Sequence, residues 1–535
     1  FGEIQALPLK NWKGDRADPR FEALADAVRS HISGGPISHA YAQSREPHVS
    51  RRGAIAGGIG VGAIAVAGVG GWLLLKPGAA NANRIAVLPF ANLSGAEDQA
   101  YFAEGIAEEL RSALSRTGLQ VIGRASSDAV KDLDTKSAAE KLDVAHILTG
   151  SVRRSPEIIR VNAQLVGGKD GVERWAQSYD RAPGDAIKIQ TDIAANVAQS
   201  LSVALGQAGL AALTLGGTKD SVAQDLLLQS RKERRDTSGV EAMRKSLALA
   251  EAAIARDPNY AQAHADKADI LVTLASTYSN SAEEVADGLG LAEAAANRAL
   301  AVAPALGSAQ AALGNVAQAR QDFSSSLQHL RRALALSPDD PDVLSTAISF
   351  LANIGEGQEG LRLADRFIGL DPLNGRAHRR KAEVLNVLGQ YDQAIAAGRK
   401  GLAVAPESTS TYWYVGLGLL LSGRESEALA AFRSSDVDDP FRLTGEALVA
   451  ARTGDAAQAD KLASELWEKF GTAFCYQQAQ IDAQLGQKEQ AFAQLNTALA
   501  SRDPGLIYLK LDPFLDPIRG DPRFAALLKK LNFPS

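Results

Sequence analysis

The side chains best suited to chemistry are three carboxylates in one predicted helix, Glu104, Glu108 and Glu109. Glu104 and Glu108 are four residues apart, so they share a helix face. A general acid and a general base need two carboxylates that converge in a partly buried site. A pair on one regular helix favours a solvated face instead. We therefore predict no catalytic residue.

The residue types also give no support for metal or cofactor chemistry. The chain has one cysteine, Cys475, which excludes an intrachain disulfide and a zinc site built from cysteines. Its seven histidines are scattered, without an HExxH motif or a close pair. The net charge of −5 provides no basic field for nucleic acid. We expect no metal, no cofactor, no nucleic-acid partner and no enzymatic activity from the residues present.

A repeat organises the second half of the chain. Its period of 34 residues is typical of a helix–turn–helix unit that stacks on copies of itself into a solenoid. The repeat is marked by five equally spaced prolines: Pro304, Pro338, Pro372, Pro406 and Pro440.

The copy at 375–408, GRAHRRKAEVLNVLGQYDQAIAAGRKGLAVAPES, resembles the tetratricopeptide repeat. Ala382 stands where the two helices of such a repeat cross, and Gly416 is its equivalent in the next copy. The resemblance implies an α-solenoid over 220–535 that ends in a C-terminal cap. It also implies a concave groove, lined mainly by the first helix of each pair, that binds a protein or a peptide.

Cations gather in this groove in the segment GRAHRRK. Guanidinium groups there would bind an acidic peptide or a C-terminal carboxylate by charge-assisted hydrogen bonds. A solvated basic helix face is the alternative, because Ala311 and Thr346 break the pattern of repeats that clamp a carboxylate. The predicted groove residues are Asn315, Arg376, Arg379, Arg380, Asn386 and Trp413.

A smaller α/β domain is predicted over residues 84–205. Apolar runs and helical spacings alternate there in the order β-α-β-α-β-β-β-α, which predicts a sheet covered by helices. The segments IAVLPFANLSG, YFAEGIAEEL and ILTGSVRR resemble the amino-terminal domain of TolB. The fold class that we predict is therefore α/β plus all-α.

Residues 1–32 contain a predicted strand and a predicted amphipathic helix. FGEIQALPLKNWKGD and the helix after it resemble the C-terminal end of bacterial Toll/interleukin receptor (TIR) domains. The resemblance implies a remnant of a flavodoxin-like domain, a fold that cleaves NAD in many bacterial members. The glutamate of that activity is expected upstream of residue 1, so no catalytic residue is carried over. Residues 33–52 are rich in Gly, Pro and Ser and are predicted to be a linker.

Residues 53–75 contain no charged residue, amide or hydroxyl. As a helix they would reach about 34 Å, enough for a hydrocarbon core of about 30 Å. We predict a transmembrane helix. The alternatives are a buried helix and a cleaved export signal, for which Arg51-Arg52 and Ala80-Asn81-Ala82 are partial motifs. Two GxxxG pairs predict close packing of two such helices, and hence a homodimer, through Gly53, Gly57, Gly58 and Gly62.

These parts together predict a membrane-anchored interaction and signalling protein. Its repeats would bind a protein or peptide, and one helix in the lipid bilayer would couple them to a TIR-type module. The bias of basic residues predicts a bacterial inner-membrane protein with a cytoplasmic N-terminus and periplasmic C-terminal domains. Two alternatives are an NAD-cleaving TIR effector, whose catalytic part lies upstream of residue 1, and an envelope transport or assembly accessory by analogy with TolB.

Overall fold

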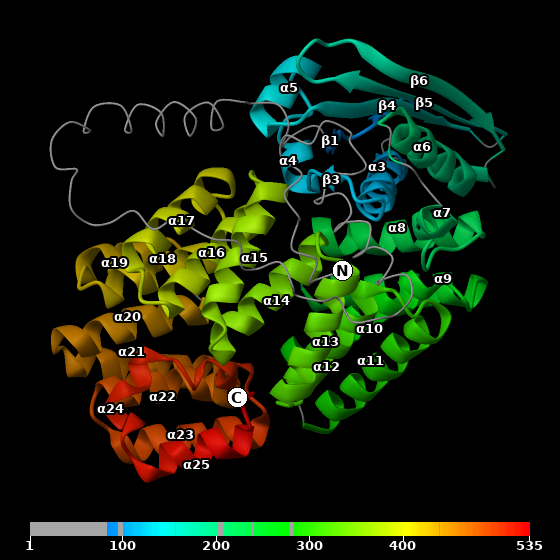
Figure 1. Ribbon diagram of the computed structural model, residues 1–535. Helices are drawn as coiled ribbons and strands as arrows, with labels where there is room; N and C mark the ends of the chain where they lie inside the picture. The colour runs from blue at the N-terminus through cyan, green and yellow to red at the C-terminus, as the bar shows by residue number, and fades with distance from the viewer. Residues whose placement is uncertain are drawn as a thin grey trace, which may run out of the picture. The chain divides into compact units, whose positions relative to one another are not determined.

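The computed structural model describes residues 83–534, apart from short gaps at 95–99, 156, 183–184, 202, 204–206, 238, 279–281 and 438 (Figure 1). The predicted TIR remnant (1–32), linker (33–52) and transmembrane helix (53–75) lie outside these residues. The same holds for the predicted helix-packing residues Gly53, Gly57, Gly58 and Gly62, through which lipid contact and a homodimer were expected.

The predicted inner-membrane localisation, with periplasmic C-terminal domains, is corrected by the structure. Among the described residues no helix is both long enough and apolar enough to cross a bilayer. A membrane-spanning helix needs about 20 predominantly apolar residues. Helix α11 (Ala282–Val302) has 21 residues but carries five charged side chains along its length.

A mixed sheet forms the first part of the described chain. Its strands run in the order β3-β1-β4-β5-β6, and β2 pairs with the far end of β4. Strand β1 is parallel to both neighbours, whereas β4, β5 and β6 are antiparallel. The strands are β1 (Arg84–Val87), β2 (Ala91–Asn92), β3 (Gln120–Val121), β4 (His146–Arg154), β5 (Ile159–Gly167) and β6 (Glu173–Arg181).

Helices cover both faces of this sheet. Successive residues of β1 point to opposite sides, so its apolar side chains pack against helices on each face. Ile85 and Val87 pack with helices α3 (Ala100–Ser115) and α6 (Ala186–Ser200). Ala86 instead packs on the other face, against residues of α5 (Thr135–Leu142). A short helix α4 (Arg124–Asp128) follows β3.

Pairs of antiparallel helices make up the rest of the described chain (Figure 1). The first helices of neighbouring pairs pack against one another, which places them on the inner side of the stack. We call their common surface the inner face. The pairs are α8/α9 (Ser221–Asp236, Val240–Arg256), α10/α11 (Ala261–Thr277, Ala282–Val302), α12/α13 (Gly307–Ala319, Phe323–Leu336), α14/α15 (Pro341–Ile354, Gly357–Leu370), α16/α17 (Gly375–Val387, Tyr391–Val404), α18/α19 (Thr409–Leu421, Glu425–Phe432), α20/α21 (Pro440–Thr453, Ala456–Phe470) and α22/α23 (Cys475–Gln484, Lys488–Ser501).

The fifth proline of the series has a different role from the other four. Pro304, Pro338, Pro372 and Pro406 each stand two residues after the end of a second helix. Pro440 instead opens α20 at its first turn, with Asp439 as the N-cap. Proline suits that position because its fixed φ matches a helix start and no amide hydrogen bond is lost there. The eight-residue helix α19 ends early, and the repeat is shortened at this point.

Two glycines allow this shortened repeat to pack closely. A Cβ atom on either Gly416 or Gly445 would overlap the ring of Phe432, which is buried between α18 and α20. Gly416→Ala is therefore expected to lower the free energy of unfolding by about 1–3 kcal/mol. Gly290 on α11 has open space at the same atom, so Gly290→Ala should instead raise stability by up to about 1 kcal/mol. Urea unfolding of both variants measures the difference, and equal signs would contradict the packing argument.

The C-terminal end of the chain returns to the middle of the array. One apolar cluster joins α13 and α14 with α22, α23 and α25 (Pro522–Leu531). The rings of Phe323 and Phe533 lie 4.7 Å apart, and Lys510 Nζ donates to the carbonyl of Ile354 at 2.8 Å. The connecting turns are η3 (Gly471–Phe474), η4 (Pro504–Tyr508), η5 (Pro513–Leu515) and α24 (Asp516–Arg519).

Candidate functional site

Most of the predicted groove residues lie on first helices but bond to the chain itself. Arg376 pairs with Asp342 one repeat earlier, at 2.6 Å. Asn386 donates through its side-chain nitrogen to the carbonyl of Tyr414 at 2.8 Å. Asn315 hydrogen-bonds to Asp269. These side chains tie neighbouring repeats together, and their predicted role toward a ligand stays a prediction.

Arg380 belongs to a buried network. Its guanidinium lies 2.6 Å from the carboxylate of Glu383, which is only 1% exposed. Ser349 of the preceding repeat donates its hydroxyl to the same carboxylate at 2.6 Å. Burial raises the pKa of Glu383, but Arg380 and Ser349 outweigh this effect and hold that pKa below its ordinary value. Arg380 is thus fully engaged within the array.

The returning C-terminal segment covers this part of the inner face. Tyr508 hydrogen-bonds to Tyr414, and both lie in the field of Arg380 and Glu383. Burial raises the pKa of Tyr508 to about 12, so its hydroxyl stays protonated at neutral pH. No local sequence pattern predicts this contact, because residues 414 and 508 are far apart in the chain.

Arg379 differs from the arginines on either side of it. Its Nε is buried and has no hydrogen-bond partner, and no acidic side chain of the described residues lies within ion-pair distance. Ser345 and Trp413 stand 34 residues before and after it, so the three occupy the same position on α14, α16 and α18. Arg379 therefore lies on the inner face without an ion pair of its own, although the carboxylate of Glu383 acts on it at longer range.

Trp413 begins a row of aromatic side chains beside Arg379. Its ring lies 5.3 Å from Phe441 at the start of α20, and Phe441 lies 5.8 Å from Phe474. Phe470 extends the row, 5.2 Å from Phe474. Phe441 is 41% exposed, so part of its ring faces solvent. We call Trp413, Phe441, Phe470 and Phe474 the aromatic row.

At the other end of the array, the α/β domain docks on the first helix pair. A Cβ atom on Gly105 of α3 would overlap Leu228 of α8, so the two helices pack closely. Asp225 of α8 pairs with Arg154 at 3.1 Å, and Tyr101 donates its hydroxyl to Asp225 at 2.9 Å. Gly105 thus permits the close approach of α3 to α8, and the ion pair between Arg154 and Asp225 adds a specific contact between the domain and the array.

A second contact links the α/β domain to the turn between α15 and α16. Asp371 in this turn accepts hydrogen bonds from the amide and the hydroxyl of Ser126 in α4. The amide of Leu373 donates to the same hydroxyl at 2.8 Å, and the amide of Gly123 donates to the carbonyl of Leu370 at 2.8 Å. Asp371 is 1% exposed. The domain is therefore held at two places that are separated along the array.

Two of the three carboxylates considered for catalysis, Glu104 and Glu109, contact α8, so the predicted solvated face is only partly open to solvent. Glu109 pairs with Arg231 of α8 at 2.9 Å, and its side chain is 13% exposed. Glu104 pairs with Arg235 at 2.9 Å, and Glu108 contacts Arg111. Each carboxylate has a guanidinium partner. The pairs made by Glu104 and Glu109 support the docking of α3 on α8.

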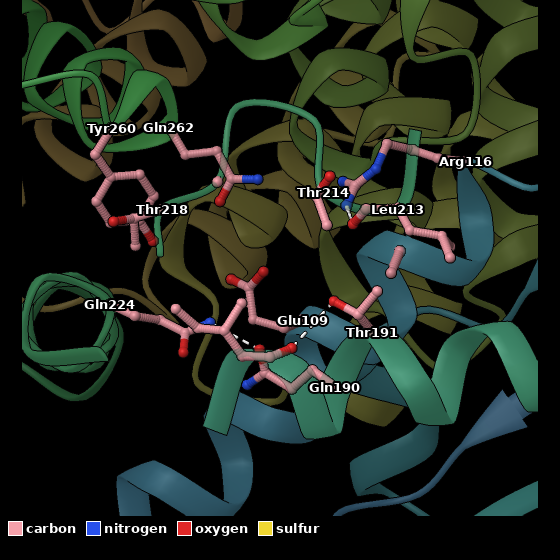
Figure 2. Close-up of a pocket in the computed structure, with 13 residues that line it drawn as sticks. Glu109, Arg116, Gln190, Thr191, Leu213, Thr214, Thr218, Gln224, Tyr260 and Gln262 are labelled. Atoms are coloured by element: carbon pink, nitrogen blue, oxygen red, sulfur yellow. Dashed lines mark hydrogen bonds between the residues drawn. The ribbon is translucent and has the colours of Figure 1, made fainter. Parts of the chain in front are cut away.

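A polar cavity lies where α3, α6 and the α7 segment (Gln207–Leu213) meet α8 and α10 (Figure 2). Its empty volume is ≈ 440 Å³, including space open to solvent. In Figure 2 the carboxylate of Glu109 points into it, but that group is paired with Arg231. Arg116 donates to the carbonyls of Ala212 and Leu213. One buried donor, Nε2 of Gln190, is left without a partner, and we assign the cavity no ligand.

Among the described residues no group of three or more His, Cys, Asp or Glu side chains is placed to hold a metal ion. The thiol of Cys475 is buried, and burial raises its pKa to about 11, so it is protonated at neutral pH. Such a thiol packs as an apolar group and is a poor nucleophile.

Asp482 on α22 is a buried carboxylate whose pKa is raised to about 6, first by burial and then by Asp460. It is 7% exposed. Its folded pKa lies above its unfolded value, so the folded state loses stability as pH rises from about 4 to about 6. Asp482→Asn should therefore raise the free energy of unfolding by about 1–3 kcal/mol at pH 7 and by almost nothing at pH 4. Urea unfolding at both pH values tests this, and an equal gain at both would contradict it.

No family model matches the chain. A stretch of 216 residues, 39% of the chain, is 36% identical to a protein of Rhizobium meliloti named putative adenylate cyclase 3 and covers 37% of it. A stretch of 136 residues is 27% identical to small glutamine-rich tetratricopeptide repeat-containing protein 2 of Mycosarcoma maydis, covering 25% of this chain and 37% of that protein. The array of 34-residue helix pairs agrees with this match. It has the tetratricopeptide-repeat fold.

A further curated match is shorter. A stretch of 95 residues is 30% identical to Hsp70-Hsp90 organizing protein 2 of Arabidopsis thaliana, covering 18% of this chain and 17% of that protein. Among solved structures, a tetratricopeptide repeat protein from Parabacteroides merdae is 11% identical, with TM-score 0.36 over 50% of this chain and 98% of that one. The type IV pilus biogenesis factor PilW is 20% identical, with TM-score 0.32 over 38% and 93%. The chain spans 37% or less of the length of these curated relatives.

Proposed function

We propose that this protein is a non-enzymatic interaction scaffold. Its tetratricopeptide repeats bind a protein or peptide on the inner face of α16, α18 and α20, next to Arg379 and the aromatic row. A contrast on this face carries the proposal. Arg376 and Arg380 each form an ion pair inside the chain, whereas Arg379 forms none. Phe441 nearby exposes part of its ring to solvent.

The rest of the inner face supports the same location. The α/β domain lies against α8, and the C-terminal segment lies against α14, α16 and α18 at Tyr414. A partner would have to displace these parts to bind there. Aromatic and arginine side chains are also the residue types that contribute most energy to protein interfaces.

A photo-crosslinker tests the location. p-Benzoylphenylalanine placed at Phe441 is expected to capture partner protein in the host cell. The matched position is Leu291 on α11, which is 58% exposed but distant from the inner face. Adducts at Phe441 that are absent at Leu291 support the proposal. The same adducts from both positions, or none at Phe441, would refute it.

The similarity to a protein named as a putative adenylate cyclase favours a second candidate. In it, the docked α/β domain and repeats regulate a signalling output that another part of a larger protein supplies. A finer version of this idea, in which residues 1–32 belong to a TIR-type output module, rests on sequence alone. Assays of NAD cleavage and cyclic AMP formation by this chain should show no turnover. Activity of the chain by itself would refute the scaffold proposal.

A further inference from the structure

Strand β6 (Glu173–Arg181) is the outermost strand on one side of the sheet (Figure 1). One of its edges pairs with β5, and among the described residues no strand pairs with its other edge. Seven of its nine residues are exposed. The backbone N–H and C=O groups along this outer edge are therefore open to a further strand.

Little in β6 blocks such pairing. Proteins usually protect an open edge with a short strand, a lysine or a proline. β6 contains neither lysine nor proline, and its nine residues exceed the usual strand length of about five or six. A bulge interrupts it at Arg174, which the register with β5 skips, but residues 175–181 pair with β5 without a break. Most of the outer edge is therefore regular.

The middle of β6 suits pairing with a second copy of itself. In an antiparallel pair with Gln177 opposite its own copy, Trp175 faces Tyr179 of the second copy, and Ala176 faces Ser178. Trp175 and Tyr179 both pack on the face of the sheet that α6 covers. Aromatic side chains that face each other across two strands stabilise the pair.

The ends of β6 are complementary in charge. Glu173 and Arg174 stand at its start. Asp180 and Arg181 stand at its end. In the pair about Gln177, the start of each strand meets the end of the other, so each end of the pair holds two acidic and two basic side chains. Opposite charges that face each other across two strands stabilise the pair, and like charges destabilise it.

Neighbouring registers lose this match. A two-fold axis perpendicular to the sheet keeps each side chain on its own face, so the axis moves along the strand by whole residues. With the axis at Ala176 or at Ser178, both Asp180 and Arg181 stand opposite uncharged residues. Charge therefore favours the register about Gln177.

Helix α6 fits the same arrangement. It packs against both β5 and β6, so it lies beneath the two outer strands. With strands about 4.8 Å apart, two copies of this helix would lie about 10 Å from each other beneath the joined sheet. Packed helices are separated by about 8–10 Å. The two helices would therefore extend the contact instead of obstructing it.

We propose that β6 pairs antiparallel with β6 of a second copy of this chain, so that two sheets join into one across a two-fold axis at Gln177. This contact belongs to the α/β domain and goes beyond the proposed partner site on the array. One strand and one helix from each copy make a small interface. The dimer is therefore expected to be reversible, with a dissociation constant of about 1–100 µM.

Charge reversal tests the pairing in the 535-residue chain. Glu173→Arg and Arg181→Glu should each weaken dimerisation about tenfold or more, because each places an excess of like charge at both ends of the strand pair. Sedimentation velocity over a range of concentrations measures the dissociation constant. Glu140→Arg, the same change at an exposed position of α5, should leave it unaltered. Thermal unfolding of each variant confirms that it is folded.

A mixture of the two reversed variants provides the stricter test. In their heterodimer the introduced arginine of one chain meets the introduced glutamate of the other, and the native Glu173 and Arg181 meet at the opposite end. The mixture should therefore dimerise about as tightly as the parent chain, although neither variant does so alone. Loss of stability or an unrelated dimer contact would give no such recovery.

A disulfide locates the axis. Gln177→Cys places two thiols directly opposite each other, within reach of a bond after a small adjustment. Oxidation should then give a covalent dimer on a denaturing gel. Glu173→Cys is the matched control, because eight residues separate position 173 from its counterpart, a distance of about 26 Å. The native Cys475 is buried and does not compete.

The outcomes are decisive for this contact and separate from the array. A chain that stays monomeric up to about 100 µM would overturn the proposal. A dimer that ignores the charge reversals, or a mixture that does not recover, would do the same. Equal crosslinking at positions 177 and 173 would refute the register. None of these results bears on crosslinking of a partner at Phe441, which tests the proposed function.

Discussion

Arg380→Ala is expected to lower the free energy of unfolding by about 3–5 kcal/mol. The variant leaves the carboxylate of Glu383 buried without its guanidinium, and Ser349 and Asn353 alone cannot replace it. A buried charge without a partner is strongly destabilising, because the remaining group has lost both water and its ion pair. Urea unfolding at pH 7 measures the loss.

Arg379→Ala is the matched control, one residue away on the same helix. Arg379 has no partner to leave behind, so its replacement should cost less than about 1 kcal/mol. Equal losses for the two variants would contradict the conclusion that Arg380 holds a buried ion pair whereas Arg379 has none. The double variant Arg380→Met with Glu383→Leu should recover much of the loss, because it removes both buried charges.

The same pair predicts an acid sensitivity. Glu383 has a folded pKa below its unfolded value of about 4.3. Its contribution to stability is therefore present above pH 4.3 or so and is lost as pH falls through the lower, folded pKa. Between about pH 5 and pH 3 the double variant Arg380→Met with Glu383→Leu should lose less stability than the parent chain.

Asp371→Ala is expected to weaken the contact between the α/β domain and the array, at a cost of about 2–4 kcal/mol. Asp371 accepts three hydrogen bonds from the side chain and amide of Ser126 and the side chain of Asn374. With alanine in its place, the buried amide of Ser126 has no acceptor there. Hydrogen exchange should accelerate at residues 123–128, and urea unfolding should report the loss of stability.

Asp365→Ala provides the control for this experiment. Asp365 lies on α15 in the same repeat and pairs with Lys381, but its side chain is 55% exposed. An exposed ion pair contributes about 0–1 kcal/mol, so this variant should change neither exchange at 123–128 nor stability by much. Unchanged exchange at Ser126 in Asp371→Ala would show that the domain is held by its contact with α8 alone.

The helix pairs of the array could be predicted from the sequence because their signals are local. The 34-residue spacing, glycines such as Gly389 with positive φ after a helix, and apolar residues at helical intervals all act within one repeat. Residues 84–200 contain the strands and helices of the predicted order, together with two short elements that were not predicted, β2 and α4. The equal spacing suggests the same role for all five prolines, but Pro440 opens α20 instead of following a second helix. A proline suits both the end of one helix and the first turn of the next.

The candidate site was only partly visible in the sequence. The segment GRAHRRK indicated cations on one helix. The sequence alone did not show which of its three arginines would be paired with carboxylates inside the chain. Their environments depend on Asp342 and Glu383 and on the return of Tyr508 from the C-terminal end. The aromatic row was missed apart from Trp413, although Phe470 and Phe474 are four residues apart. The turn η3 brings the ring of Phe474 next to Phe441, and Phe470 packs against Phe474.

The sequence by itself determined the repeat unit, the helices within it and the α/β order before it, because backbone propensity and apolar periodicity act over a few residues. The tertiary structure alone decided which charges are free. Contacts such as Asp371 with Ser126 and Tyr414 with Tyr508 join residues from distant parts of the chain. No local pattern encodes such contacts. They arise when stacked repeats bring separate surfaces together, and burial then makes each unpaired charge costly.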